Sequence, residues 1–488
     1  MLHRDASTIS RGQLSATNHG CECEQMGPFK VLREDRGNGQ WPIRRVFPGF
    51  GRVIRATISG TTTKALLWLV LFVLPIDGFG PTAALFKEAG GKPINLLFAG
   101  VFLLYLLRGR LAEALTHIEI RRITAAYVAI AVLGAFAFAY HYGDVFVSPG
   151  SSRTPGSQFM QQTSMMLLFI AEFLALCAFF ASVDRRQLVA NLLPSVVAAH
   201  ILIFLLEGIG VFRNGGPVSL AWFRGGGGQI DRPSGLMSEP AYWGAFAATY
   251  SLPLLFNRGR NKAMGIVLAL VLLILGALIQ AKTMFPAAIA GFAYVVASGS
   301  ASRQDRKIGI VLIGLVILGG ISVALMTAAA SVDENLSTAM RLGSTLLAWN
   351  VAASGLGFVG VGTGQFHFFF TRDFAPSFLL LSNEAQDLIT GVSESRASTF
   401  NLPIRYLVED GVLGLAVAAG IIVSVLRRHW SSADAATRIA VGFIVTSVFF
   451  LLTQDSYCYP LLAFGLALAV TESSGSSYAI VDRTHQAK

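Results

Sequence analysis

The sequence contains little charge. Asp, Glu, Lys and Arg make up 14% of its 488 residues, whereas 53% of the residues are hydrophobic and the mean hydropathy is +0.59. A soluble globular chain carries about 25% charged residues, so this composition excludes an ordinary soluble domain. Apolar stretches approaching the roughly 20 residues that cross a bilayer as a helix recur from Ala65 almost to the C-terminus. They exclude a soluble protein with a single membrane anchor.

Cysteine is also scarce, with four residues at Cys21, Cys23, Cys177 and Cys458. Their scattered positions predict no disulfide framework. The loops that we place outside the membrane hold no cluster of Asp, Glu and His with ligand spacing, so the sequence implies neither a metal nor another cofactor.

Twelve apolar segments can be drawn, at 65–76, 94–107, 123–141, 163–182, 187–210, 239–256, 263–280, 284–298, 307–330, 403–426, 438–453 and 459–471. Because lipid offers no hydrogen bonds to the backbone, each segment must be a helix. We therefore predict an all-α polytopic integral membrane protein with about 12 transmembrane helices. Residues 64–471 form this domain, and 331–402 form one large periplasmic loop with many apolar residues.

The polar stretch 1–63 lacks the apolar run of a signal peptide and predicts a disordered cytoplasmic tail. Residues 472–488 predict a second cytoplasmic tail. With both ends inside, most of the 38 lysines and arginines fall on the cytoplasmic side, as the positive-inside rule requires. The net charge of +10 therefore indicates membrane topology and gives no support to nucleic-acid binding.

The strongest local motif spans 232–240 and reads Arg-Pro-Ser-Gly-Leu-Met-Ser-Glu-Pro. Arg232 and Glu239 stand seven residues apart where a helix is predicted to begin. Pro240 suits the first turn of a helix, and an acidic residue there favours the helix dipole. A simple helix start with a capping acid and a functional Arg–Glu pair both remain open for this motif.

A second signal is a sparse set of outer cations, formed by Arg232, Lys282, Arg341 and Arg405. Lys282 lies in a hairpin too tight to project far into water. Cations on the side that topology disfavours suggest an anionic ligand, and arginine binds phosphate through two hydrogen bonds. Contact with lipid headgroups is the alternative for any single one of them.

The predicted large loop holds a helix over 337–349 that contains Arg341, followed by the glycine-rich stretch 360–366. No flanking strand and helix accompany these glycines, which excludes a dinucleotide-binding fingerprint. A structural turn is favoured over a phosphate cradle. After the loop, the tenth segment carries Arg405, Glu409 and Asp410 at its outer end.

The predicted spans contain few ionisable residues, namely Glu172, His200, Glu207 and, near a span end, Asp455. Such residues are costly in lipid and are functional candidates for that reason. They look isolated from one another, which favours structural partners over an ion pathway.

These motifs resemble the Wzy-type polysaccharide polymerases and the related O-antigen ligases. The resemblance rests on 232–240, on the helix around Arg341 with the glycines after it, and on Leu-Val-Glu-Asp-Gly at 407–411. It implies an enzyme of the bacterial inner membrane that transfers a growing glycan from an undecaprenyl diphosphate carrier to a hydroxyl of another lipid-linked repeat unit. A flippase and a chain-length regulator would be its partners.

In this interpretation Arg232, Arg341 and Arg405, with Lys282, stabilise the charge of the diphosphate leaving group. Glu239 is the first choice for the base that accepts the hydroxyl proton, and Glu409 is the second. Ligases carry a His-Asn pair where this chain has Phe400 and Asn401. We therefore rank polymerase above ligase, unless His367 takes the role of that histidine.

A rival from another class is a secondary transporter or lipid flippase. Such a protein concentrates its unusual residues near the bilayer midplane, whereas here they gather at outer helix ends and in one loop. A noncatalytic assembly protein is the remaining alternative.

Overall fold

The computed structural model describes residues 60–77, 79, 82, 92–144, 154–181, 183–210, 233, 235–237, 240–255, 262–298, 302–328, 336–369 and 399–471. All regular secondary structure in these stretches is helical, as the predicted all-α class requires. Residues 60–63 begin the first described helix. The remainder of the two predicted tails, and most of the predicted loop after 369, lie outside the described residues.

The helices before the glycine-rich stretch are α2 (Gly60–Val73), α4 (Pro93–Leu107), α5 (Arg110–Ala114), α6 (Ile118–His141), η2 (Tyr142–Asp144), α7 (Pro155–Phe180), α8 (Val183–Gly208), α10 (Pro240–Leu255), α11 (Lys262–Leu278), α12 (Met284–Ala297), α13 (Arg303–Ala328), α14 (Leu336–Val351), the π-helix η4 (Ala352–Leu356) and α15 (Gly357–Val359). After it follow α16 (Phe366–Phe369), α18 (Leu402–Glu409), α19 (Gly411–His429), α20 (Ala435–Leu451) and α21 (Pro460–Val470).

Several helix starts follow from local sequence. Proline occupies the first turn of α4, α7, α18 and α21, where its missing N–H would have no helical partner. Thr154 and Ser157 form a capping box at α7. Asn401 accepts from Ile404 N at the start of α18, and Asp434 accepts from Thr437 N at the start of α20. These caps set where the helices begin, including the one that carries Arg405.

Four helices are long and apolar enough to cross a membrane, namely Ile118–Asp144, Pro155–Phe180, Leu188–Gly208 and Gly411–His429. Six shorter apolar helices of 10–17 residues accompany them among the described residues. The protein is therefore a helical membrane protein by the length and composition of its helices.

The core of the bundle lies around α21, in which every residue from Pro460 to Val470 is buried. It packs against α7 and α20, and α20 in turn packs against α10 and α12. Large apolar side chains are exposed on the outer helices, including Phe136 on α6 and Leu318 on α13. Exposed apolar faces of this kind suit contact with lipid.

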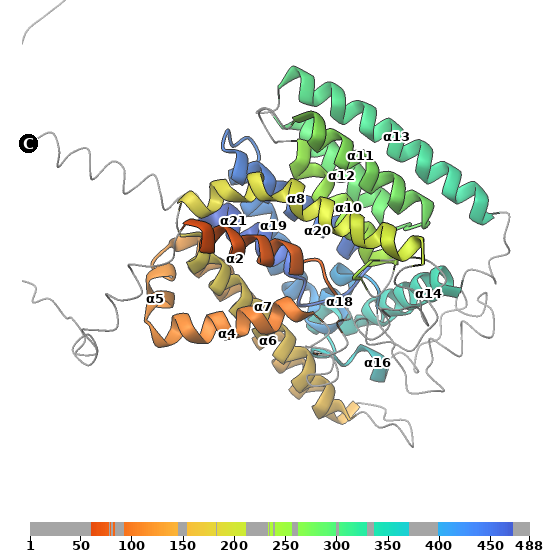
Figure 1. Ribbon diagram of the computed structural model, residues 1–488. Helices are drawn as coiled ribbons and strands as arrows, with labels where there is room; N and C mark the ends of the chain where they lie inside the picture. Colours follow the sequence, from red (N-terminus) through yellow and green to blue (C-terminus); the bar gives the residue numbers. More distant parts are fainter. Residues whose placement is uncertain are drawn as a thin grey trace, which may run out of the picture. The chain divides into compact units, whose positions relative to one another are not determined.

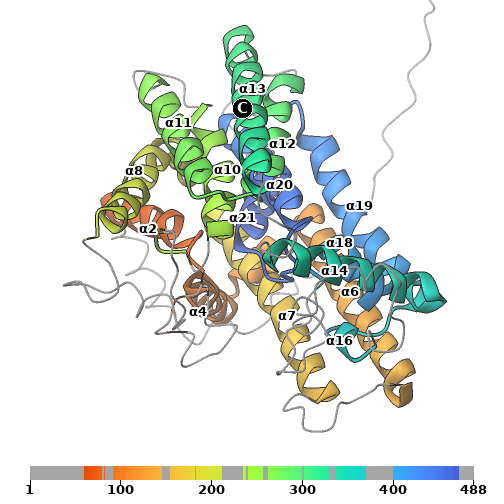
Figure 2. The ribbon, with the colours of Figure 1, turned by 90° about the vertical axis from the view of Figure 1, so that its right-hand side faces the viewer.

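A second, smaller cluster of buried side chains lies where α14, α16 and α18 meet, and it includes Leu347, Val361, Phe369 and Val408. Figures 1 and 2 show these three helices together near the later part of α6. This cluster anchors part of the predicted loop to the bundle, because α14 and α16 both come from that stretch.

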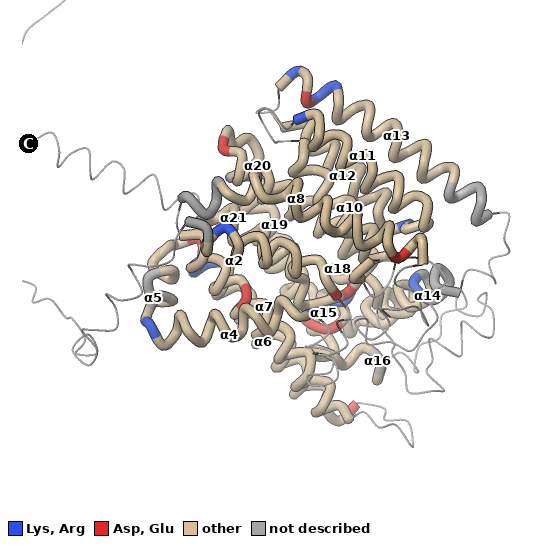
Figure 3. Tube along the Cα trace, viewed as in Figure 1, with Lys and Arg blue, Asp and Glu red and all other residues tan. Residues whose placement is uncertain are grey.

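Among the described residues, many charged side chains lie near helix ends and a few lie inside the bundle (Figure 3). At the last turn of α19, Arg428 and His429 pair with Glu119 at the first turn of α6. Lys262 and Asp305 pair at the starts of α11 and α13. Arg405 and Glu409 lie on α18, which ends just before α19 begins at Gly411, so the basic last turn of α19 lies at the far end of α19 from them.

Candidate functional site

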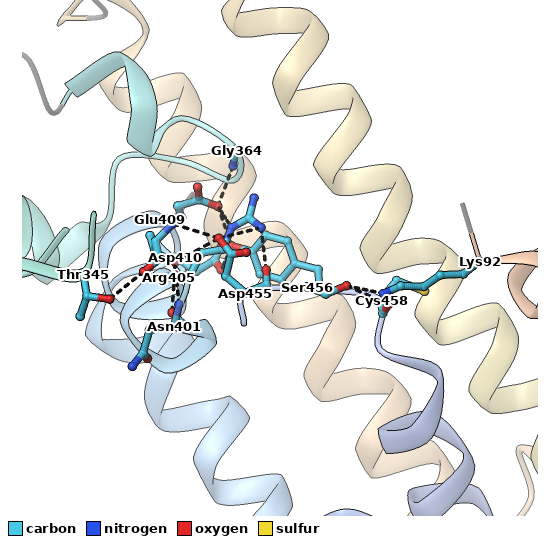
Figure 4. A network of polar contacts seen from close by, with 12 residues as sticks. Lys92, Thr345, Gly364, Asn401, Arg405, Glu409, Asp410, Asp455, Ser456 and Cys458 are labelled. Carbon is cyan, nitrogen blue, oxygen red and sulfur yellow. Dashed lines mark hydrogen bonds and ion pairs between the residues drawn. The ribbon is translucent and has the colours of Figure 1, made fainter. Parts of the chain in front are cut away.

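Three cations from distant parts of the chain donate to the loop between α20 and α21, and Figure 4 shows two of them, Lys92 and Arg405. Arg341 of α14 donates to Thr453 O at 2.8 Å. Arg405 of α18 donates to Asp455 O at 2.7 Å. Lys92, which precedes α4, donates to Cys458 O at 2.8 Å and to Ser456 Oγ at 2.9 Å. The loop at 453–458, which we call the carbonyl loop, thus gathers three positive charges.

Arg405 makes the densest set of contacts in this group. Its Nε donates to Glu409 Oε2 at 3.1 Å, one helical turn further along α18. The carboxylate of Asp455 lies 3.7 Å from its Nη1, and the guanidinium lies over the Tyr457 ring at 4.2 Å from the centroid. A guanidinium has five N–H donors, and the hydrogen bonds named here use two of them.

Glu409 is buried, and its Oε2 accepts from three donors. Besides Arg405 these are the backbone N–H of Gly364 at 2.8 Å and the hydroxyl of Tyr457 at 2.7 Å. These three hydrogen bonds occupy the oxygen that the proton of a substrate would have to reach. The geometry therefore suits Glu409 to balancing the charge of Arg405 better than to accepting a proton.

Asp410 lies next to this ion pair. Its Oδ1 accepts from the Thr363 hydroxyl at 2.9 Å, and its Oδ2 lies 3.1 Å from the Tyr457 hydroxyl. Burial, together with the neighbouring charge of Glu409, raises the pKa of Asp410 to about 8. This pKa keeps the Asp410 carboxyl group mostly protonated at neutral pH, beside the ion pair of Arg405 and Glu409.

The glycine-rich stretch forms a structural turn, as favoured from the sequence. Gly360, Gly362 and Gly364 all have positive φ, and a Cβ on any of them would meet neighbouring backbone or side-chain atoms. Gly362 N donates to Glu409 O and Gly364 N to the Glu409 carboxylate. These glycines therefore bring backbone donors to a carboxylate of the protein itself.

The predicted single helix over 403–426 is two helices, α18 and α19, broken at Asp410. Gly411 has a φ of 76°, and a Cβ there would lie 2.6 Å from Val359 O. The break lets the glycine-rich turn pack directly against the backbone of the chain at 409–411. Its consequence is that Glu409 and Asp410 point into the bundle from the end of a short helix.

The predicted site residues fall into three groups. Arg341, Arg405 and Glu409 lie at or beside the carbonyl loop. Lys282 lies in the turn between α11 and α12, where Gln280 has a positive φ and Thr283 Oγ1 donates to Ala241 O, so this turn adjoins the start of α10. His367 belongs to α16, but its side chain is outside the described residues, as are Arg232 and Glu239 entirely.

The ionisable residues predicted inside spans have structural partners. His200 Nε2 lies 2.9 Å from Phe72 O, and its ring stacks on that of Phe72. Glu207 accepts from Gly235 N at 2.7 Å and so holds part of the 232–240 motif. Glu172 accepts from Cys458 Sγ at 3.7 Å. The last contact ties α7 to the inner end of the carbonyl loop.

Sequence reasoning missed Lys92 and Tyr457. Lys92 lies directly before a helix-starting proline, in a loop that the predicted topology puts outside, so the argument applied to Lys282 could have identified it. Tyr457 carried no signal in the sequence, because its role depends on the hydroxyl reaching two carboxylates that precede it by nearly fifty positions. Within the described stretches, no three residues of His, Cys, Asp and Glu are grouped to hold a metal ion.

Comparison of the chain with known protein families, with curated proteins and with solved structures finds no match.

Proposed function

We propose that this protein polymerises lipid-linked oligosaccharide repeat units into an exopolysaccharide, capsule or O-antigen at the periplasmic face of a bacterial inner membrane. The observation that carries the proposal is the meeting of Arg341 and Arg405 on one short loop, beside the Glu409 carboxylate. In this proposal the chain crosses the membrane about 12 times, and 331–402 is its large periplasmic loop.

The reaction needs a group that stabilises a departing diphosphate. The bond between the sugar C1 and the diphosphate oxygen breaks, and a bond between C1 and an acceptor hydroxyl oxygen forms. Negative charge grows on the departing diphosphate, and fixed guanidinium groups lower the energy of that transition state. Arg341 and Arg405, with Arg232 and Lys282 as further candidates, would supply this stabilisation.

The acceptor hydroxyl loses its proton in the same step, so a base is required. The three donors on Glu409 Oε2 argue against this residue as the base. Glu239 therefore stays our first choice. A Glu239→Gln variant at normal protein level is expected to make no long polymer, and full-length polymer from that variant would exclude Glu239 as the base.

The placement of the site supports an outer location. The ion pairs at the ends of α6 and α19 contain Arg428 and lie at the opposite end of α19 from the Arg405–Glu409 pair. Because basic residues accumulate on the cytoplasmic side, the carbonyl loop belongs on the periplasmic side. Lipid-linked repeat units on that side would be delivered by a flippase, and a chain-length regulator would limit the product.

The test is the profile of lipid-linked glycans in cells that lack this protein. These cells are complemented with the native chain, with Arg341→Ala, or with Arg306→Ala at matched expression. Arg306 is a matched control because it also donates to a backbone carbonyl, Ser298 O, but near the start of α13 and away from the carbonyl loop. We expect single repeat units to accumulate without the protein and with Arg341→Ala, and long polymer to return with the other two.

Other profiles would support the alternatives. Long polymer that stays on its lipid carrier in the deleted strain would indicate a ligase. An unchanged profile would overturn the proposal and favour a transporter or flippase.

A further inference from the structure

Phe400 has a backbone conformation that is unfavourable for a residue with a side chain. Its φ is 48°, in the left-handed region, where a bulky L-residue is an outlier. Within the described residues, the other non-glycine residue with positive φ is Gln280, in a tight helix hairpin. Such strain persists where the neighbouring structure enforces it, and it gathers at ligand-binding and active sites.

The neighbours of Phe400 enforce this conformation. On one side, Thr399 donates from its backbone N at 3.0 Å and its hydroxyl at 3.2 Å to Asp455 Oδ2. Its carbonyl accepts from the Thr345 hydroxyl at 2.9 Å. On the other side, Asn401 donates to Leu452 O and caps α18. Phe400 is therefore held between two anchored residues, with no freedom to relax into an ordinary conformation.

The strained backbone places the Phe400 ring beside a cation of the site. The guanidinium of Arg341 lies over this ring, 5.4 Å from its centroid. The ring is half-buried, unlike the fully enclosed aromatic side chains of the bundle core. A ring that served only to bury apolar surface would stabilise the protein more in the bundle core. A gap in the core could also be filled by any apolar side chain without a strained backbone.

We propose that Phe400 is a specificity-determining residue, whose ring forms a platform for the sugar attached to a diphosphate bound at Arg341. This inference rests on the proposed function. A guanidinium binds phosphate, and an aromatic face packs against the C–H groups of a sugar ring, so the pair fits a sugar diphosphate. The strained backbone at Phe400 keeps its ring at a fixed distance from the Arg341 guanidinium.

The test compares two ligands of the purified full-length protein in lipid nanodiscs. One is undecaprenyl diphosphate without sugar, and the other is the same lipid carrying the repeat unit, extracted from cells that lack the protein. We expect the native chain to bind the glycosylated lipid about tenfold more tightly, the size of one good aromatic contact. Phe400→Leu removes this preference and leaves the affinity for the sugar-free lipid within about twofold.

Three further variants separate a sugar contact from a structural role. Phe400→Trp keeps the preference because it retains an aromatic face. Phe400→Gly relieves the strain, so its thermal midpoint is unchanged or higher while the preference is lost. Phe358→Leu, at an exposed phenylalanine of α15, is the matched control and changes neither property.

Two results would overturn the inference in distinguishable ways. If the native chain prefers the glycosylated lipid and Phe400→Leu keeps that preference, Phe400 does not contact the sugar, although the proposed function stands. If the native chain binds neither lipid, the proposed function fails and this inference fails with it.

Discussion

Arg341 and Arg405 donate to carbonyls that lie two residues apart, Thr453 O and Asp455 O, at 2.8 and 2.7 Å. Arg341 belongs to α14, within the predicted large loop, and Arg405 belongs to α18, which begins where that loop ends. Their separation is therefore set by the carbonyl loop and not by either helix alone. The loss of Arg405 has a further consequence, because Arg405 also pairs with the buried Glu409 carboxylate.

Arg405→Ala is expected to destabilise the protein strongly. It removes the guanidinium beside Glu409, whose side chain is 3% exposed, and leaves that carboxylate without its charge partner. Breaking a buried ion pair in this way costs about 3–5 kcal/mol. The thermal unfolding of the protein in nanodiscs measures this change.

Arg428→Ala is the control, because Arg428 forms an ion pair with Glu119 at the other end of α19 but its side chain is 52% exposed. An exposed pair contributes under about 1 kcal/mol, so this variant should unfold close to the native midpoint. Equal losses for the two variants would show that the Arg405–Glu409 pair is not the buried contact described here.

Gly134→Ala is expected to disrupt the contact between α6 and the glycine-rich turn. A Cβ on Gly134 would overlap the Thr363 hydroxyl and the Asp410 carboxyl group, which are held by their own hydrogen bond. Overpacking of this kind costs about 1–3 kcal/mol. Gly100→Ala in α4 is the matched control, because a Cβ there meets nothing within 4 Å.

The Gly100→Ala variant should be neutral or more stable by up to about 1 kcal/mol, since alanine favours helix more than glycine does. The pair is compared by thermal unfolding and by protein level in membranes. A Gly134→Ala variant as stable as Gly100→Ala would mean that the turn packs elsewhere.

Much of the helical architecture was predictable, because lipid permits few alternatives. The helix over 337–349 is confirmed by α14, and the tight hairpin at Lys282 is confirmed by the positive φ of Gln280. Both follow from local patterns, namely apolar periodicity and the short distance between two apolar segments.

The contacts at the carbonyl loop were not predictable in the same way. The Asp410-Gly411 dipeptide is a turn signal, but a glycine within an apolar helix is also common in membrane proteins, so the sequence alone does not decide between a break and a continuous helix. The break becomes necessary only when the glycine-rich turn approaches Gly411 backbone to backbone. The role of Tyr457 likewise depends on a contact between distant parts of the chain.

Asp410 gives the stability a defined dependence on pH. In the folded protein burial raises its pKa from 3.8 to about 8, whereas in the unfolded chain it ionises near its ordinary value. Between these two values the unfolded state binds fewer protons, so the free energy of unfolding falls as pH rises, and it levels off above about pH 8. Asp410→Asn removes this contribution.

The measurement is the thermal midpoint of native protein and Asp410→Asn from acidic to mildly alkaline pH. Asp144→Asn controls for the loss of a carboxylate, because the Asp144 side chain is 58% exposed. We expect the native and Asp144→Asn midpoints to fall together with rising pH, and the Asp410→Asn midpoint to fall less. Parallel curves for all three proteins would contradict a protonated Asp410.

The orientation of the bundle can be tested with single cysteines, because the proposed topology puts the two ends of α19 on opposite sides of the membrane. Ser354, in the π-helix after α14, and Ser431, just after α19, are both exposed. Each is changed to cysteine in a chain whose own four cysteines are replaced and which still sustains glycan synthesis. A membrane-impermeant maleimide is then added to spheroplasts.

We expect Ser354→Cys to react in intact spheroplasts and Ser431→Cys to react only after permeabilisation, since basic residues such as Arg427 and Arg428 in the last turn of α19 favour the cytoplasmic side. The parent chain without cysteine controls for background labelling. The reverse pattern would place the carbonyl loop in the cytoplasm. Lipid-linked repeat units that await polymerisation lie on the periplasmic side, so that result would separate Arg341 and Arg405 from their proposed substrate and exclude the polymerase.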